Sequence, residues 1–233
     1  TNLSRTRPYT IKTLATSVGA ISSYPARAVV VFGSYRNDTL NAGGCTGIMV
    51  GDRWVLTGAH CRDYGHPPVL RNDRTYDSQY IVPAYTNGTT IQGLDPVRCK
   101  KVYYPKKYNG LRSDLLLIEL EQPLGNLTGW VSLGFANDEQ FLGSRVLQKF
   151  STPGGAVGGF AVYNGDTMYH SYGKPNVFEN TDGAFDFAPP LIGFSGYSIE
   201  CGVGYGESGS SLFYTNNVDS FITYGTLITA ASL

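Results

Sequence analysis

The 233-residue chain carries little charge and no excess of either sign. Its 18 basic and 18 acidic residues balance, and charged residues make up only 15% of the sequence. A balanced chain is not drawn to nucleic acid or to an anionic membrane surface. No apolar run approaches the length of a transmembrane helix, and no basic segment followed by an apolar one marks a signal peptide. We therefore expect no nucleic-acid partner and no membrane insertion, and Thr1 is interpreted as the start of a processed, mature chain.

Cysteine is scarce, and its four positions are Cys45, Cys61, Cys99 and Cys201. An even number suits disulfides in an oxidising compartment, although spacing alone leaves the pairing open. The alternative, a zinc site, would need a Cys-x-x-Cys or His-x-x-x-His spacing, and neither occurs. No loop is acidic enough to indicate calcium. The prediction is that the protein uses no metal and no cofactor.

Abundant Gly, Tyr, Thr and Ser favour a β-rich extracellular domain over a helical cytosolic one. Four Asn-x-Ser/Thr sequons support the same compartment, since they are acceptors for N-glycosylation in secreted chains. They begin at Asn2, Asn37, Asn87 and Asn126. We expect a secreted glycoprotein.

Short apolar, β-branched segments alternate with Gly, Pro, Asn and Asp through the first half of the chain. They are residues 28–32, 47–50, 53–57, 78–82, 97–104 and 115–120. Gly51-Asp52 lies between two of them, as a hairpin turn would. Residues 1–24 show no periodicity and are expected to form an extended arm. Without a convincing amphipathic helix, this pattern predicts an all-β barrel or sandwich.

His60 lies in the segment Thr57-Gly-Ala-His-Cys61, at the end of an apolar strand. A disulfide from Cys45 to Cys61 would join the two ends of the preceding hairpin and fix the backbone beside the imidazole. The other histidines, His66 and His170, lack such surroundings and are interpreted as surface residues.

Asp114 precedes the apolar segment 115–120 in Ser113-Asp-Leu-Leu-Leu-Ile. An aspartate before a strand is commonly a turn residue or a cap. It can also be a carboxylate at the mouth of the strand, where it accepts an imidazole N–H and stabilises the cation formed during proton transfer.

Ser208 lies in Gly206-Glu-Ser-Gly-Ser, just before another apolar run. The flanking glycines allow a tight turn that presents the serine and aims consecutive N–H groups at one point. In a glycine-rich chain the same letters also suit an ordinary loop. Ser210 lacks the flanking glycines, so Ser208 is the better candidate nucleophile.

Together these three motifs resemble the chymotrypsin-like serine protease family, from about Ala28 to the C-terminus. The order His, Asp, Ser fits that family, whereas other serine hydrolase folds use different orders. Within the family, residues 122–130 and 151–155 are similar to segments of the bacterial-type branch that contains the glutamyl endopeptidases.

The resemblance implies two six-stranded antiparallel β-barrels with the active site between them. Residues 1–19 would form an N-terminal arm, 20–121 the first barrel, 122–130 the crossing and 131–233 the second barrel. The implied partners are a polypeptide substrate and a protein inhibitor, with the protease acting as a monomer.

The resemblance also assigns roles to residues. Ser208 would be the nucleophile, His60 the general base and then acid, and Asp114 the group that orients and stabilises the imidazole. The backbone N–H groups of Gly206 and Ser208 would form the oxyanion hole.

Two departures from the family limit this transfer. Glu207 stands where animal proteases have an aspartate that binds a new N-terminal amine, and Thr1 does not begin an Ile-Val-Gly-Gly sequence. Two branches of the family each use a residue of their own to recognise a charged substrate side chain. Both of these residues are absent here. An uncharged pocket wall for an apolar or small residue is expected, made by Gly202, Val203, Leu227 and Ala230. If Glu200 reached this pocket, a basic preference would return.

In the family a cystine often lies beside the catalytic histidine, which Cys45 and Cys61 would form here. Cys99 and Cys201 remain, and by counting they should bond each other and tie the two barrels together. The alternative is two buried thiols.

Other functional classes stay open at this point. A protease-like fold that no longer cleaves could serve as a binding module, a reading that Glu207 supports although no member of the triad is missing. A structural secreted β-domain with accidental motifs is a further alternative. An esterase would use the same machinery, and peptide-bond cleavage would separate it from a protease.

Overall fold

The computed structural model describes most of the first half of the chain and selected parts of the second. The described residues are 16–17, 21–36, 39–61, 80–105, 114–134, 147–152, 156–157, 161–162, 165–173, 175–178, 191–194, 209–217 and 220–226. Strands dominate them, with a single short α-helix and two 3₁₀ turns among these ranges. None of the helices in this part of the chain has the length and apolar character needed to cross a membrane.

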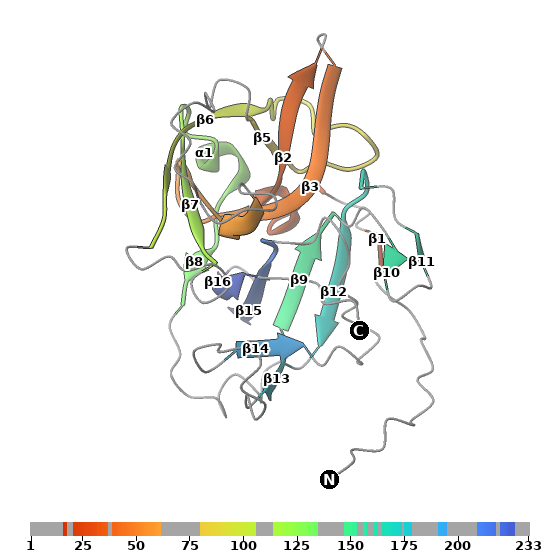
Figure 1. Ribbon diagram of the computed structural model, residues 1–233, viewed down its shortest axis with the longest axis vertical. Helices are drawn as coiled ribbons and strands as arrows, with labels where there is room; N and C mark the ends of the chain where they lie inside the picture. Colours follow the sequence, from red (N-terminus) through yellow and green to blue (C-terminus); the bar gives the residue numbers. More distant parts are fainter. Residues whose placement is uncertain are drawn as a thin grey trace.

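The first half closes into a six-stranded antiparallel barrel in the order β2-β3-β4-β7-β6-β5 (Figure 1). Its strands are β2 (Val29–Arg36), β3 (Thr39–Met49), β4 (Trp54–Thr57), β5 (Tyr80–Pro83), β6 (Val97–Tyr103) and β7 (Leu116–Leu120). Every strand predicted from the sequence in this region is present, which confirms the β-barrel reading for this half.

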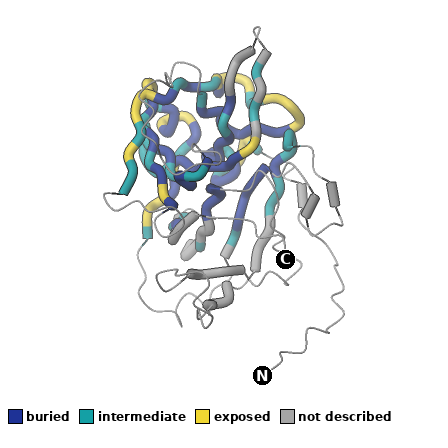
Figure 2. The backbone as a smooth tube through the Cα atoms, in the orientation of Figure 1, coloured by how far each residue is buried: buried dark blue, intermediate teal, exposed yellow. Residues whose placement is uncertain are grey.

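Alternation along the strands explains why the barrel closes. In β7, Leu116, Ile118 and Leu120 are almost fully buried, while the residues between them are partly exposed. Side chains of a strand point alternately to its two faces, so one face of each strand fills the barrel. Figure 2 shows buried residues along the strands of this barrel. Each fully buried Val, Leu or Ile contributes about 1.5–3 kcal/mol through removal from water.

After the barrel, the chain crosses over through a one-turn helix, α1 (Gly125–Thr128). Gly125 donates its N–H to the Asp52 carbonyl at 2.7 Å, and a Cβ there would lie 2.8 Å from the Asp52 Cα. Only glycine permits this approach of the crossing to the β3–β4 turn. Four residues are too few to show helical periodicity, so the sequence pattern did not predict α1.

The residues before β2 hold the crossing in place from the other side. Arg27 Nε donates to the Thr128 carbonyl at 2.9 Å, and the Tyr24 hydroxyl donates to the Trp130 carbonyl at 2.8 Å. The Tyr24 ring also meets Phe221 edge-on, with centroids 5.2 Å apart. The segment around η1 (Ala26–Ala28) therefore connects the first barrel, the crossing and the second half.

The described residues of the second half form a six-stranded sheet in the order β1-β12-β9-β15-β16-β8. Its strands are β1 (Thr16–Ser17), β8 (Ser132–Leu133), β9 (Leu147–Ser151), β12 (Tyr169–Gly173), β15 (Ser211–Asn217) and β16 (Ser220–Thr226). All neighbours are antiparallel except β8 and β16, which pair in parallel. Two residues of the expected N-terminal arm thus supply an edge strand.

Two small hairpins accompany this sheet. One pairs β10 (Ala156–Val157) with β11 (Ala161–Val162), and the other pairs β13 (Pro175–Phe178) with β14 (Leu191–Phe194). A closed second barrel stays a prediction, as does the division of the chain at residues 19, 121 and 130.

The two halves are joined by backbone and side-chain hydrogen bonds along one seam. The Val131 N–H donates to the Met49 carbonyl at 2.9 Å, and the Met168 N–H donates to Thr86 Oγ1 at 3.2 Å. The Thr152 N–H donates to Thr46 Oγ1 at 3.3 Å. Residues at the end of β9 therefore lie against β3 in the first barrel.

Candidate active site

His60 lies on the 3₁₀ turn η2 (Ala59–Cys61), directly after strand β4. Cys61 forms a disulfide with Cys45 on β3, with 5.8 Å between the two Cα atoms. This cystine ties the turn to the neighbouring strand. A Cβ on Gly58 would lie 3.0 Å from two atoms of the His60 ring, so a side chain at position 58 would push the imidazole aside.

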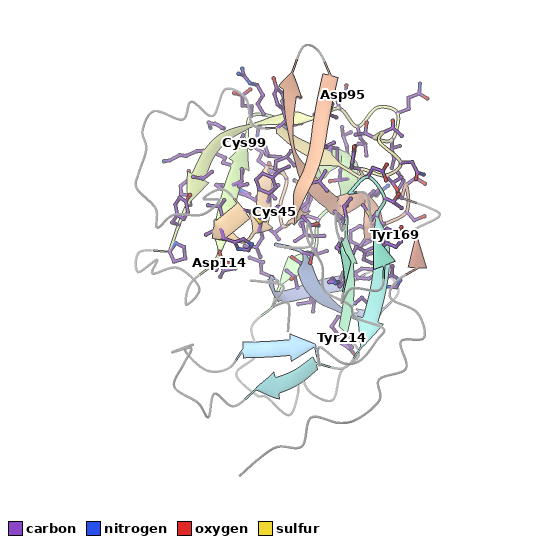
Figure 3. All side chains as sticks on the ribbon, turned by 45° about the vertical axis from the view of Figure 1, so that its right-hand side comes forward. Cys45, Asp95, Cys99, Asp114, Tyr169 and Tyr214 are labelled. Carbon is purple, nitrogen blue, oxygen red and sulfur yellow. A yellow bond between two sulfur atoms is a disulfide. The ribbon has the colours of Figure 1, made fainter. Side chains whose placement is uncertain are left out.

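Asp114 holds His60 through two hydrogen bonds. The His60 backbone N–H donates to Asp114 Oδ1 at 2.8 Å, and the ring Nδ1 pairs with Asp114 Oδ2. The Asp114 side chain is 1% exposed, whereas that of His60 is 34% exposed. In Figure 3, Asp114 lies at the end of the first barrel nearest to the second sheet. The carboxylate is thus shielded from water while the imidazole is partly exposed.

This geometry favours one tautomer of the His60 ring. A carboxylate accepts hydrogen bonds, so Nδ1 carries the proton and Nε2 keeps its lone pair. The structure places Nε2 4.0 Å from Cys61 Sγ, too far for more than a weak contact. Nε2 is therefore free to act as a base toward a group at the seam, and the buried carboxylate stabilises the imidazolium that results.

Gly209, two residues before β15 (Ser211–Asn217), packs directly against this turn. Its φ is +80°, and a Cβ there would run into Thr57 Oγ1 and the Thr46 carbonyl and lie 2.9 Å from the Gly58 nitrogen. The segment that carries Gly209 therefore touches the backbone two residues before His60. Ser208, the predicted nucleophile, lies outside the described residues but is bonded directly to Gly209.

Residues 19–148, more than half of the chain, match the Trypsin family. The chain belongs to the trypsin family. The order of barrel strands, the cystine and the His60–Asp114 pair all lie within the matched segment. Family membership identifies a trypsin-like serine protease, with polypeptides as the class of substrate, and confirms the resemblance drawn from the three motifs.

Solved structures of bacterial-type proteases share the fold. One is the protease Anisep from Arthrobacter nicotinovorans, with a TM-score of 0.55, 17% identity and 88% of each chain covered. Another is a Glu endopeptidase in complex with MPD, with a TM-score of 0.59 and 16% identity, covering 95% of this chain and 94% of that one. At such identities the likeness concerns the fold alone.

A network of threonines at the seam was not predicted. Thr57 Oγ1 donates to the Thr46 carbonyl at 2.9 Å, and Thr46 Oγ1 accepts the Thr152 N–H. All three threonines are fully buried, between the His60 turn and the strand next to β15. Thr57 belongs to the motif that contains His60, but nothing in the sequence signals its partner, which lies 11 residues away.

A metal centre at His60 does not fit the donor atoms. Cys45, His60 and Cys61 place one potential ligand atom each within 4.8 Å of one another. However, both sulfur atoms belong to the disulfide, and zinc binds thiolates. The cluster therefore serves to hold the histidine.

Cys99 is buried on β6, and the one disulfide among the described residues does not include it. Its pairing with Cys201 stays a prediction, beside the alternative of two buried thiols. Figure 3 places Cys99 well inside the first barrel. Cys201 lies outside the described residues.

His170 is not the surface residue that the sequence indicated. It is half-buried on β12, where its ring stacks on Phe150 at 4.3 Å and its Nε2 lies 3.2 Å from Gln148 Oε1. Burial lowers the pKa of His170 from its ordinary value, because the charged form loses its hydration. These partners belong to the sheet and not to the His60 site. His66 lies outside the described residues.

Of the remaining predicted site residues, some are described by the structure and others lie outside the described residues. Asn87 and Asn126 are exposed, Asn87 at a turn with φ of 51°, as a glycan acceptor would require. Outside the described residues lie both oxyanion donors, the pocket residues and two sequons, namely Gly206, Ser208, Gly202, Val203, Leu227, Ala230, Asn2 and Asn37.

Proposed function

We propose that this trypsin-family chain is a secreted serine endopeptidase with the triad Ser208, His60 and Asp114. The observation that carries the proposal is the buried carboxylate of Asp114, which holds His60 by two hydrogen bonds beside Gly209. Gly209 packs against the backbone that leads into the His60 turn, and Ser208 is bonded directly to Gly209, which supports a serine close to His60. The proposed fold includes a second six-stranded barrel built around the second sheet.

In this mechanism His60 Nε2 removes the proton of Ser208 as its Oγ attacks the peptide carbonyl carbon. The carbonyl oxygen becomes an oxyanion, which the N–H groups of Gly206 and Ser208 stabilise. The imidazolium then gives its proton to the leaving amine, the C–N bond breaks and an acyl-enzyme forms. Water attacks the ester with His60 again as base, which releases the acid and restores Ser208.

Asp114 makes these proton transfers favourable without itself becoming protonated. Its buried carboxylate keeps the proton on Nδ1 and stabilises the imidazolium, and its bond to the backbone N–H fixes the ring plane. In sites of this kind, loss of one oxyanion donor costs about 3 kcal/mol of transition-state stabilisation. The glycine at position 206 therefore matters nearly as much as the serine.

The proposed specificity is for an apolar or small uncharged residue before the scissile bond. Gly202, Val203, Leu227 and Ala230 carry no charge and would form the pocket wall. The proposed compartment is extracellular, because the disulfide forms in an oxidising environment and the sequons at Asn87 and Asn126 are exposed.

A fluorophosphonate probe tests the proposal directly. It forms a covalent bond only with an activated serine, and mass spectrometry locates the modified peptide. We expect a single label on Ser208, no label in Ser208→Ala and greatly slowed labelling in His60→Ala, with cleavage of a peptide library following the same order. Folded protein that takes no label would contradict an active protease and would favour a binding module.

A further inference from the structure

Three of the five large apolar side chains that are exposed among the described residues lie in one short stretch. They are Leu127, Trp130 and Leu133, with exposed fractions of 59%, 46% and 63%. Single exposed apolar residues are common on proteins, but a group of them marks a surface for contact. Residues 122–134 contain no charged side chain, so this surface does not select its partner by ion pairs.

The backbone beneath these side chains is fixed to the first barrel. The Gly125 N–H donates to the Asp52 carbonyl at 2.7 Å, and the Val131 N–H donates to the Met49 carbonyl at 2.9 Å. The inward positions of the crossing are filled by buried residues, such as Leu124. The exposed side chains therefore belong to a segment that is anchored at both ends and has no inward position left for them.

A glycosylation sequon lies inside this stretch. It is Asn126-Leu-Thr128, and Asn126 is exposed. The Gly129 N–H donates to the Gly125 carbonyl at 2.7 Å, which closes the helical turn α1. Residues three apart in such a turn are about 5–6 Å apart, so the Cα atoms of Asn126 and Trp130 lie within about 10 Å of each other. An asparagine side chain and two linked sugars together span this distance.

The two apolar side chains nearest to Asn126, namely Leu127 and Trp130, form what we call the crossing patch. About half of each is exposed, so the patch offers on the order of 200 Å² of apolar surface. A stable contact between two protein chains needs about 800 Å² from each partner. The indole ring is large, flat and apolar, and the C–H face of a sugar packs on such a ring. The size of the patch therefore fits the first sugars of a glycan better than a second protein chain.

We propose that Asn126 carries an N-linked glycan whose first sugars cover the crossing patch. In the transfer, the Asn126 amide nitrogen forms a bond to the anomeric carbon of a sugar that a lipid pyrophosphate carries. The bond from that carbon to the pyrophosphate oxygen breaks, the lipid pyrophosphate leaves, and the amide gives up one proton. The proposal rests on the secreted compartment of the proposed function and not on its catalysis.

The third residue of the sequon indicates when the glycan is attached. Thr128 is fully buried, and its Oγ1 donates to the Gly129 carbonyl at 2.8 Å. Transfer to a sequon uses this hydroxyl, which the folded crossing keeps out of reach. The glycan is therefore attached before the crossing folds, while the chain enters the secretory compartment.

Asn87 supplies a matched control for the test. Its sequon Asn87-Gly-Thr89 is also exposed, but no large apolar side chain is exposed among the described residues 84–90. The chain and the variants Asn126→Gln and Asn87→Gln are secreted from a eukaryotic host in a Trp54→Phe background. Since the sequence has two tryptophans, Trp130 is then the single one.

The first readout combines mass spectrometry with fluorescence. Enzymatic release of the glycans in heavy-oxygen water marks each asparagine that carried one. We expect a glycan on Asn126 and protection of Trp130 from acrylamide. The quenching constant of Trp130 should rise about twofold in Asn126→Gln, because the indole ring regains contact with solvent. It should be unchanged in Asn87→Gln.

The second readout is self-association of the folded chain, followed by light scattering with Trp54 restored. Asn126→Gln should associate more than the wild-type chain, because its crossing patch is bare. Adding Trp130→Ser to Asn126→Gln should return the scattering to the wild-type level. Equal association with and without Trp130→Ser would overturn the proposal, because the glycan would then act elsewhere than on the patch.

Other outcomes would also overturn the proposal. An unmodified Asn126 beside a modified Asn87 would do so while leaving the secreted compartment intact. A glycan on Asn126 whose removal leaves the quenching of Trp130 unchanged would show that the sugars point away from the patch. If Asn126→Gln is not secreted, enzymatic release of the glycan from the folded Asn87→Gln chain makes the same comparison. No readout uses catalysis, so a chain that takes no fluorophosphonate label still decides the question.

Discussion

The first barrel and the second sheet bury different kinds of side chain. The buried residues of the barrel are mostly Val, Ile, Leu and Ala, and its strands close on one another. Among the described buried residues of the second sheet, Phe150 is apolar and the others are polar, namely Lys149, Ser151, Ser211 and Thr223. An apolar core tolerates many arrangements of similar volume, whereas buried polar groups need specific partners. The barrel is thus the scaffold, and the sheet depends on individual pairings.

The candidate active site lies where these two regions meet. His60 and Asp114 come from the rim of the barrel, and Gly209 comes from the turn that leads into the sheet strand β15. The barrel side is complete in itself, with a buried carboxylate, a cystine and a half-exposed imidazole. The sheet contributes Gly209, whose backbone packs closely against the turn before His60. Small shifts of the backbone should therefore disturb the site more on this side than on the barrel side.

The largest expected effect is on the barrel side of the site. Asp114→Asn should lower kcat by about 10⁴-fold, because an amide can donate a hydrogen bond to Nδ1 and so favour the wrong tautomer of His60. Steady-state hydrolysis of a peptide substrate measures this change. Asp95→Asn, an exposed aspartate of the same half, should leave kcat unchanged. Equal losses in both variants would contradict the role of Asp114.

Gly209→Ala tests the approach of the sheet to the barrel. The new Cβ would meet Thr57 Oγ1 and a backbone carbonyl at a residue with φ of +80°, so we expect a loss of about 3–5 kcal/mol in the free energy of unfolding. Gly88→Ala is the control, because its φ is +75° but no atom lies within 4 Å. It should cost only about 1–2 kcal/mol in urea unfolding. Equal losses in the two variants would show that the positive φ, and not the contact with Thr57, accounts for the loss of stability.

The disulfide tests how far the barrel side relies on a covalent link. The joint change of Cys45 and Cys61 to Ala opens a loop with a sequence separation of 16. The free energy of unfolding should fall by about 3 kcal/mol, chiefly because the unfolded chain gains freedom. Urea unfolding with and without reductant measures it. A wild-type chain that is insensitive to reductant under unfolding conditions would contradict this expectation.

Thr57 tests the hydrogen bond that lines the seam. Thr57→Val keeps the shape but removes the hydroxyl that donates to the buried Thr46 carbonyl, which should cost about 1–2 kcal/mol in the free energy of unfolding. Thr57→Ser keeps the hydroxyl and should lose less. The opposite order, with valine milder than serine, would show that packing outweighs the hydrogen bond at this seam.

The smallest expected effect belongs to His170 in the second sheet. Burial lowers its pKa in the folded state, so the unfolded chain binds a proton more readily. The neutral form stabilises the fold above a pH of about 6.5, and this stability is lost as the pH falls below that value. Urea unfolding at pH 7.5 and 5.5 should show a smaller loss in His170→Gln than in wild type. Equal losses would mean that other groups account for the acid sensitivity.

Much of the first barrel could be predicted from local patterns. Segments such as 28–32 and 115–120 are short, apolar and β-branched, and each became a barrel strand. The helix α1 was missed because one turn carries no periodic signal. Counting cysteines could not decide the pairing of Cys99, because a count ignores where the chain places each residue, and Cys99 lies in a core.

The sequence predicted the residue types of the candidate site. It did not predict the buried residues that hold them in place. Motifs around His60, Asp114 and Ser208 are local, so they can be read from neighbouring letters. The threonine network joins Thr46, Thr57 and Thr152, which no local pattern relates. Lys149 likewise looks like an ordinary strand lysine until its burial is known.

The sequence by itself determined which strands form in the first barrel, which family the chain belongs to and which residue types are available for catalysis. These properties follow from side-chain alternation and short motifs, which act over a few residues. The tertiary structure alone decided that Asp114 is buried against His60, that Gly209 touches the turn before that histidine and that Lys149 loses its water. Such facts depend on which surfaces meet when the chain closes, because burial and hydrogen-bond partners are properties of residues far apart in sequence.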